Sequence, residues 1–292
     1  MRMARHNIVM TAVAVATSAI LQWGLLSARA EADDMREELK AGEIAAITAG
    51  TAAALLAGTL SEKSAKGDPP RWNSAFGFEA SLQRTLGGRY YPDKTNFLDG
   101  TTGSAYTAVG GLAVLLAADL AWTDDETGSV AGQDVFLYAT GIAATKGVTS
   151  IAKGIVRRAR PMITLEPELA RQRTNVDTLF DNQSFFSGHA SSAFFASTFL
   201  NLRLRAIMRQ EMSFGDYRNW RWAPPCALFG WASFVGWSRI QSYEHFFLDV
   251  VAGAATGVLM AELFYSFQEE SDLSADQAEG AAGHMIQVTV RF

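Results

Sequence analysis

The chain has 292 residues, enough for one large domain, and 49% of them are hydrophobic while only 19% are charged. The formal net charge of −5 argues against a general nucleic-acid-binding protein, because such proteins normally carry a basic surface. The single cysteine, Cys226, excludes an internal disulfide, and its apolar neighbours beside two prolines predict a buried structural thiol.

The N-terminus has the pattern of an export signal. Arg2 and Arg5 precede an uncharged apolar stretch over residues 8–26, and Ala28-Arg29-Ala30 places small residues where a signal peptidase cleaves. We therefore expect residues 1–30 to be a signal peptide. Because the apolar stretch is long for a signal core, an uncleaved N-terminal anchor is the alternative. Both readings direct the chain to the cell envelope.

Six apolar segments follow, and their hydrophobicity predicts helices. Many are rich in alanine and glycine, which suits close helix packing in a bilayer, and several approach the ~20 residues needed to cross one. The sequence therefore predicts an all-α helical bundle of about six apolar, membrane-spanning helices. The alternative is a soluble helical domain with an unusually apolar core. The segments are 41–60, 101–122, 134–156, 188–203, 222–238 and 246–267.

Two stretches depart from this pattern. Residues 61–100 form a polar insertion in which Trp72, Phe76 and Phe78 recur at roughly helical spacing, so we expect either an amphipathic helix on the membrane surface or a plain packing helix. The end of the chain begins small and polar and finishes in a strand-like alternation. We divide the chain into a leader over 1–30, N-terminal helices with the insertion over 31–133, a core over 134–267 and a flexible tail over 268–292.

Charges near the predicted helices give conflicting topologies. The linker 202–221 contains five arginines and two acidic residues, which the positive-inside rule places in the cytoplasm, so that the loops at the opposite helix ends face outward. A cleaved signal followed by three spans would instead bring those loops to the cytoplasmic side. The conflict disappears if segment 41–60 does not cross, if the export prediction is wrong, or if the protein is soluble.

Cations stand where two of the predicted helices end or begin. Lys153 and Arg160 are seven residues apart, two helical turns, so we expect them on one face just before Pro161 ends the helix. The neighbouring residues Arg157 and Arg158 are interpreted as an ordinary basic helix end.

Ser187-Gly188-His189 has the pattern of a helix entry. Free amides at a helix N-terminus bind anions, and a glycine lets the ligand approach the backbone. Further along, His245 and Asp249 are four residues apart, which predicts one helix face and a carboxylate that orients the imidazole. Arg239 adds a permanent positive charge. Cations, amides and histidines together predict a phosphate site.

In chain order, Lys-x6-Arg-Pro, Ser-Gly-His and Ser-Arg-x5-His-x3-Asp resemble the tripartite signature of the type 2 phosphatidic acid phosphatase superfamily, which also contains class A bacterial acid phosphatases and vanadium haloperoxidases. The second part departs once, with Phe186 where the family usually has proline. The resemblance covers roughly residues 134–267. The first and third parts match in full at Lys153, Arg160, Pro161, Ser238, Arg239, His245 and Asp249.

The resemblance implies a mechanism. His245 would attack phosphorus to form a phosphohistidine while Asp249 holds its ring, and His189 would protonate the leaving oxygen and later activate water. No metal or other cofactor is implied, and the motifs contain no cluster at metal-ligand spacing. The groups implied to bind the nonbridging oxygens are Lys153, Arg160, Ser187, Gly188 and Arg239.

The resemblance therefore implies a phosphatase acting on a lipid phosphomonoester or diphosphate, such as phosphatidate, phosphatidylglycerophosphate, a polyprenyl diphosphate or a lipid A phosphate. We expect it in the inner membrane of a bacterial cell envelope, with a periplasm-facing site and no nucleic-acid partner. The alternatives are a soluble periplasmic acid phosphatase acting on small esters, a vanadium-dependent haloperoxidase and a catalytically silent membrane scaffold. The oligomeric state stays open.

Overall fold

The structure is a computed structural model that describes residues 39–88, 100–122, 129–172 and 181–267. The predictions for the leader over 1–30 and the tail over 268–292 lie outside the described residues. Within the described ranges every regular element is a helix, and one isolated bridge joins Trp72 to Arg158. This confirms the all-α prediction.

All six predicted apolar segments are helices, and four short helices accompany them in the described part of the chain. The short helices are α3 (Gly77–Leu86), α6 (Pro161–Leu165), α7 (Pro167–Ala170) and α9 (Phe214–Trp220). The long helices are α2 (Ala41–Ala65), α4 (Gly100–Trp122), α5 (Ser129–Val156), α8 (Gly188–Glu211), α10 (Ala223–Gln241) and α11 (Phe247–Ser266).

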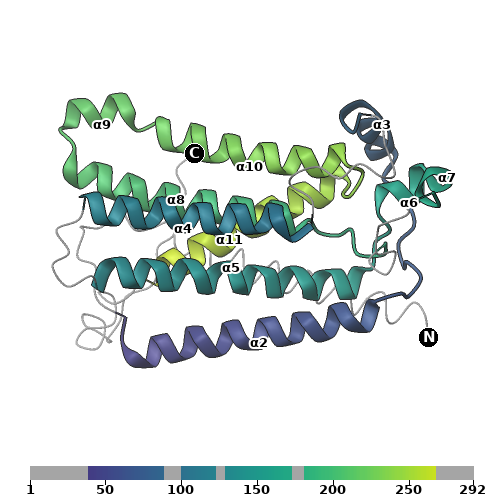
Figure 1. Ribbon diagram of the computed structural model, residues 1–292, viewed down its shortest axis with the longest axis horizontal. Coiled ribbons are helices and arrows are strands. Elements are labelled where there is room, and N and C mark those ends of the chain that lie inside the picture. The colour runs from purple at the N-terminus through teal and green to yellow at the C-terminus, as the bar shows by residue number, and fades with distance from the viewer. Residues whose placement is uncertain (1–38, 89–99, 123–128, 173–180, 268–292) are drawn as a thin grey trace, which may run out of the picture.

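The long helices lie side by side, with α3, α6 and α7 at one end of the bundle and α9 at the other (Figure 1). We call these the α3 end and the α9 end. Successive long helices alternate in direction, so that α2, α5 and α10 end at the α3 end, where α8 and α11 begin. The three sequence motifs, which stand at those helix boundaries, therefore meet at the α3 end.

Three of the described helices, α2, α5 and α11, are long and apolar enough to cross a membrane, judged by length and composition. The described part of α4 adds a shorter apolar helix. Helix α2 has the full dimensions of a crossing helix and packs along α5.

Large apolar side chains face outward from the bundle. Leu56 and Leu60 of α2 and Leu120 of α4 are between 60% and 78% exposed. Cys226 is also exposed, so the prediction of a buried thiol was wrong. The apolar sequence neighbours of Cys226 do not indicate that it is buried, because α10 directs part of its apolar surface outward, including Trp231.

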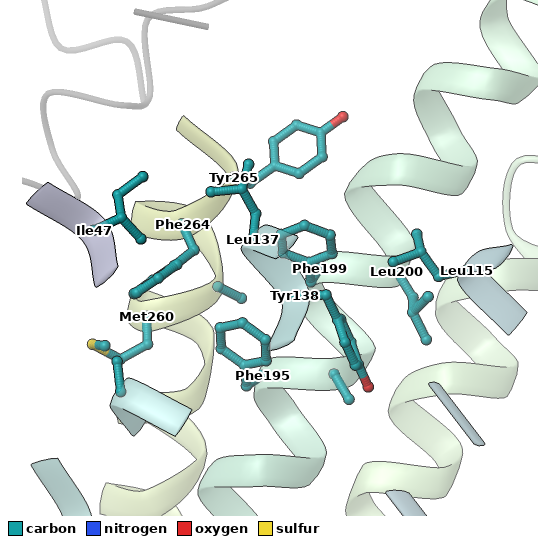
Figure 2. Close-up of a cluster of buried hydrophobic side chains, with 13 residues drawn as sticks. Ile47, Leu115, Leu137, Tyr138, Phe195, Phe199, Leu200, Met260, Phe264 and Tyr265 are labelled. Atoms are coloured by element: carbon teal, nitrogen blue, oxygen red, sulfur yellow. The ribbon is translucent and has the colours of Figure 1, made fainter. Parts of the chain in front are cut away.

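Aromatic rings from α5, α8 and α11 fill the centre of the bundle (Figure 2). Phe195 and Phe199 stack with ring centroids 5.9 Å apart, and Tyr138 meets Phe199 edge-on at 5.6 Å. Phe264 closes the group against Phe195 at 6.3 Å. Offset and edge-on ring pairs contribute energy beyond area burial, so this cluster fixes how the three helices pack.

A second buried feature lies toward the α9 end. Arg203 belongs to α8 and is almost fully buried, with its Nε 2.7 Å from carboxylate oxygens of both Asp119 and Asp134. The topology prediction counted Arg203 in an exposed linker, but its side chain is buried in the bundle. Four arginines near the α9 end remain against two acidic residues, so the positive-inside argument keeps its direction.

The contact between α2 and α5 depends on two glycines. A Cβ on Gly58 would lie 2.5 Å from the carbonyl oxygen of Gly147, and a Cβ on Gly147 would lie 2.6 Å from the carbonyl carbon of Ala54. Neither position has room for a side chain. The two backbones therefore approach each other as closely as glycine allows.

We expect Gly147→Ala to destabilise the protein and Gly50→Ala not to. The first places a methyl group against the α2 backbone, and overpacking of this kind costs about 1–3 kcal/mol. Gly50, also on α2, has open space, and alanine favours a helix interior by roughly 1 kcal/mol. Thermal unfolding in detergent measures both. Equal effects would contradict the close α2–α5 contact.

Candidate active site

The first motif spans a break in the helix. Helix α5 ends at Val156, Arg157 has φ 50°, and the chain then runs extended to Arg160, which is the N-cap of α6. The prediction that Lys153 and Arg160 share a helix face was therefore wrong. Lys153 lies in the last turn of α5, whereas the backbone N–H of Arg160 donates to the carbonyl of Asp181 over 3.0 Å.

The second motif opens α8, as the helix-entry pattern predicts. Ser187 is the N-cap, fully buried, and its hydroxyl accepts from the N–H of Ala190 over 3.4 Å. A Cβ built on Gly188 would lie 3.9 Å from the Nζ of Lys153, so the first turn of α8 lies beside that ammonium group. The helix N-terminus and a cation therefore stand together, an arrangement suited to an anion.

The third motif places His245 in the turn between α10 and α11. Its backbone N–H donates to the carbonyl of Arg239 over 3.3 Å, and its Nδ1 lies 2.6 Å from the carbonyl oxygen of Ser184. A carbonyl only accepts, so Nδ1 carries the hydrogen and Nε2 has the lone pair. The ring is thus held as the tautomer that a nucleophilic Nε2 requires.

Asp249 is connected to His245 through Ser184. Its Oδ2 accepts from the hydroxyl of Ser184 over 2.5 Å and from the N–H of Phe246 over 2.9 Å, and its Oδ1 lies 2.6 Å from Arg158. The sequence led us to expect Asp249 to bond the ring of His245. In the structure His245 lies before α11 and Asp249 in its first turn, and Ser184 stands between them.

Sequence reasoning missed two residues here. Ser184 belongs to none of the three motifs, yet its hydroxyl and carbonyl connect Asp249 to His245. Arg158 was interpreted as an ordinary helix end, but its side chain is fully buried against Asp249. The one available signal was its position two residues before Arg160, inside the first motif.

The predicted phosphate-binding cations act electrostatically on His245. Burial lowers the pKa of His245 well below its ordinary value, and the positive charges of Arg160, Lys153 and Arg239 lower it further, with a smaller contribution from His189. These groups come from all three motifs, which meet at the α3 end. A neutral imidazole among three cations is suited to attack an anion.

Arg160 already holds one anion in this structure. Its guanidinium forms an ion pair with the carboxylate of Glu244, the residue before His245. Both side chains are about four-fifths buried. The contact shows that an anionic oxygen can reach Arg160 directly beside His245.

The described residues thus form an all-α bundle whose three motifs meet at one end, and comparison with known sequences gives a family match. Residues 134–272 match the PAP2 superfamily, the superfamily that the motif resemblance indicated. No solved structure matches the chain significantly.

Two groups of relatives illustrate the match. Phospholipid phosphatase 2 of Homo sapiens is 28% identical over 149 residues, covering 44% of this chain and 48% of the relative. Phospholipid phosphatase 1 of Mus musculus is 30% identical over 146 residues, covering 44% and 48%. The chain thus spans about half the length of the curated relatives it matches.

We expect the ring of His245 to stay neutral at pH 6.5 and to gain its proton only at clearly lower pH. Selective ¹³C labelling of the four histidines and NMR titration in detergent measures this. Arg160→Gln removes a nearby positive charge and should raise the midpoint. Arg171→Gln, an exposed site paired with Glu168, is the control and should leave it unchanged. A midpoint at or above 6.5 in the unaltered protein would contradict the buried cationic site.

Proposed function

We propose that the protein is a phosphatase that hydrolyses a lipid phosphomonoester or diphosphate through a phosphohistidine at His245. The observation that carries this proposal is the 2.6 Å contact between Nδ1 of His245 and the carbonyl of Ser184, which leaves the lone pair of the neutral ring on Nε2, together with the three cations that lower its pKa. The names of the relatives, phospholipid phosphatases, and the outward apolar faces of α2 and α4 support a lipid substrate.

In the first half of the proposed reaction, the Nε2 lone pair of His245 attacks phosphorus and the bond from phosphorus to the leaving oxygen breaks. His189 gives its proton to that oxygen. Lys153, Arg160 and Arg239 hold the nonbridging oxygens, together with the Ser187 hydroxyl and the Gly188 amide at the start of α8. Arg160 would exchange Glu244 for the phosphate.

In the second half, His189 takes a proton from water and the resulting hydroxide attacks phosphorus. The N–P bond breaks and returns its electron pair to Nε2 of His245. The phosphorylated ring keeps its Nδ1 hydrogen and is therefore cationic, which the carbonyl of Ser184 stabilises directly. Asp249 acts on the same charge through Ser184.

We also propose that the protein lies in the bacterial inner membrane with its site toward the periplasm. Four arginines near the α9 end carry the positive charge that favours the cytoplasmic side. Trp220 and Trp222, about 60% exposed, stand at the same end, where amphipathic rings suit the membrane–water interface. The α3 end, which carries the site, then faces the other side.

We expect purified protein in detergent with EDTA to release phosphate, and His245→Ala to release less than about a thousandth as much, since the nucleophile is lost. Phosphatidate, a polyprenyl diphosphate and p-nitrophenyl phosphate are compared. Preference for a lipid supports the proposal, and preference for the small ester indicates an acid phosphatase. Equal activity of the two proteins, with matched unfolding temperatures, would overturn the role of His245.

The single cysteine tests the orientation. Cys226 is exposed and lies near the start of α10, at the α9 end. We expect a membrane-impermeant thiol reagent to leave it unlabelled in intact cells and to label it after permeabilisation. Asn73→Cys in a Cys226→Ser background places the thiol at the exposed α3 end and should label in intact cells. The reverse pattern would place the site in the cytoplasm.

A further inference from the structure

Glu79 is a buried carboxylate from outside the family match. It belongs to α3, in the polar insertion between α2 and α4, and no part of it is exposed. Its Oε2 accepts from the N–H of Phe76 over 2.9 Å, and its Oε1 accepts from the N–H of Leu248 over 3.2 Å. The insertion therefore contacts the first turn of α11, one residue before Asp249.

Glu79 and Asp249 share one arginine. The guanidinium of Arg158 lies 2.5 Å from Glu79 and 2.6 Å from Asp249, and all three side chains are fully buried. Its guanidinium carbon also lies over the ring of Trp72 at 4.1 Å and over the ring of Phe246 at 4.2 Å. These cation–π contacts add to the two ion pairs in holding Arg158 in place.

Both carboxylates contact hydrogen-bond donors. Arg158 forms an ion pair with each of them, three backbone N–H groups donate to their oxygens, and the Ser184 hydroxyl lies 2.5 Å from Asp249. Two negative charges and one positive charge leave a net negative charge. If Asp249 alone held Arg158, the pair would be neutral. Glu79 therefore leaves an excess of negative charge behind the Ser184 carbonyl that binds His245.

We propose that Glu79 is a positioning residue for His245, which acts by sharing Arg158 with Asp249 so that a net negative charge persists behind the histidine ring. The inference rests on the proposed function, because that charge matters most when the ring becomes cationic in the phosphohistidine. Glu79 also orders the turn from His245 to Asp249, since its carboxylate accepts a hydrogen bond from the N–H of Leu248.

A purely structural role for α3 is the competing explanation, and the same helix supplies the control. Gln83 is also buried, and its Nε2 donates to the carbonyl of Ile240 over 2.5 Å. Gln83→Leu removes this contact between α3 and α10 without changing any charge. If Glu79 only docks α3, Glu79→Gln and Gln83→Leu should have similar effects.

The kinetic experiment compares Glu79→Gln, Glu79→Asp and Gln83→Leu with the unaltered protein on the preferred substrate. We expect Glu79→Gln to lower kcat by roughly 10- to 100-fold, with KM within about twofold. Losses of this size are typical when a residue that orients a functional histidine from behind is replaced. Glu79→Asp keeps the charge and should retain most of kcat. Equal losses of kcat in Glu79→Gln and Gln83→Leu would overturn the proposal.

The second readout needs no activity. Among the described residues, the charged or titratable groups around His245 are Lys153 of α5, His189 of α8, Arg239 of α10, Asp249 of α11, and Arg158, Arg160 and Glu244 of the connecting segments. Glu79→Gln leaves these unchanged and removes one buried negative charge, so the NMR midpoint of His245 should fall, while Glu79→Asp and Gln83→Leu leave it in place. An unchanged midpoint in Glu79→Gln would overturn the proposal.

The two readouts separate this inference from the proposed function. If His245→Ala keeps full activity, the phosphohistidine mechanism fails, yet the NMR midpoint still measures the charge that Glu79 supplies. If His245→Ala is inactive and Glu79→Gln changes neither kcat nor the midpoint, the inference fails alone. Because glutamine replaces an acceptor oxygen with a donor, thermal unfolding accompanies each variant, and Glu79→Asp supplies the charge comparison in a protein that keeps both oxygens.

Discussion

The buried ion pair between Arg158 and Asp249 is the interaction on which the α3 end depends. A charge removed from water without a partner costs several kcal/mol, so these two side chains must stay together once the helices pack. The pair joins the segment after α5 to the first turn of α11, and the Asp249–Ser184 hydrogen bond adds the segment before α8. Three distant parts of the chain are thereby held around one carboxylate.

The bundle and its ends have different tasks. Aromatic rings of α5, α8 and α11 fix the helices, whereas the site is built from the turns where those helices begin and end. Short connections on a rigid bundle allow small changes of side chain without repacking the centre. An arginine shared between two carboxylates occurs toward both ends, Arg158 at the α3 end and Arg203 toward the α9 end.

The six apolar helices were predictable because hydrophobicity is a local property, and the helix entry at Ser187 was predictable because its capping pattern is local too. The helix boundaries were less predictable. Helix α8 continues to Glu211, eight residues beyond the prediction, and Arg203, which was counted in a linker, pairs inside the bundle. Nothing in the sequence signals that Arg157 adopts a positive φ, which separates Lys153 from the turn that carries Arg160.

The residues that the sequence could not reveal are those whose partners are far away along the chain. Glu79 and Arg158 are 79 residues apart, and Ser184 and His245 are 61 apart, so no periodicity links them. The three motifs contain the residues proposed to contact the substrate, because the reaction requires particular side chains at those positions. The groups behind them need only supply charge and geometry, and a chain can place these in an insertion such as the one that contains α3.

The direction of helix α2 bears on the membrane topology. Helix α2 begins at the α9 end, so residue 41 lies at the end near the four arginines. If those arginines are cytoplasmic, residue 41 is cytoplasmic as well. A signal cleaved after Ala30 would leave residue 31 outside, and the ten residues 31–40, five of them acidic, would have to cross the bilayer. Each charge in that position is costly, so a cleaved export signal and an outward-facing site exclude each other in a membrane-spanning bundle.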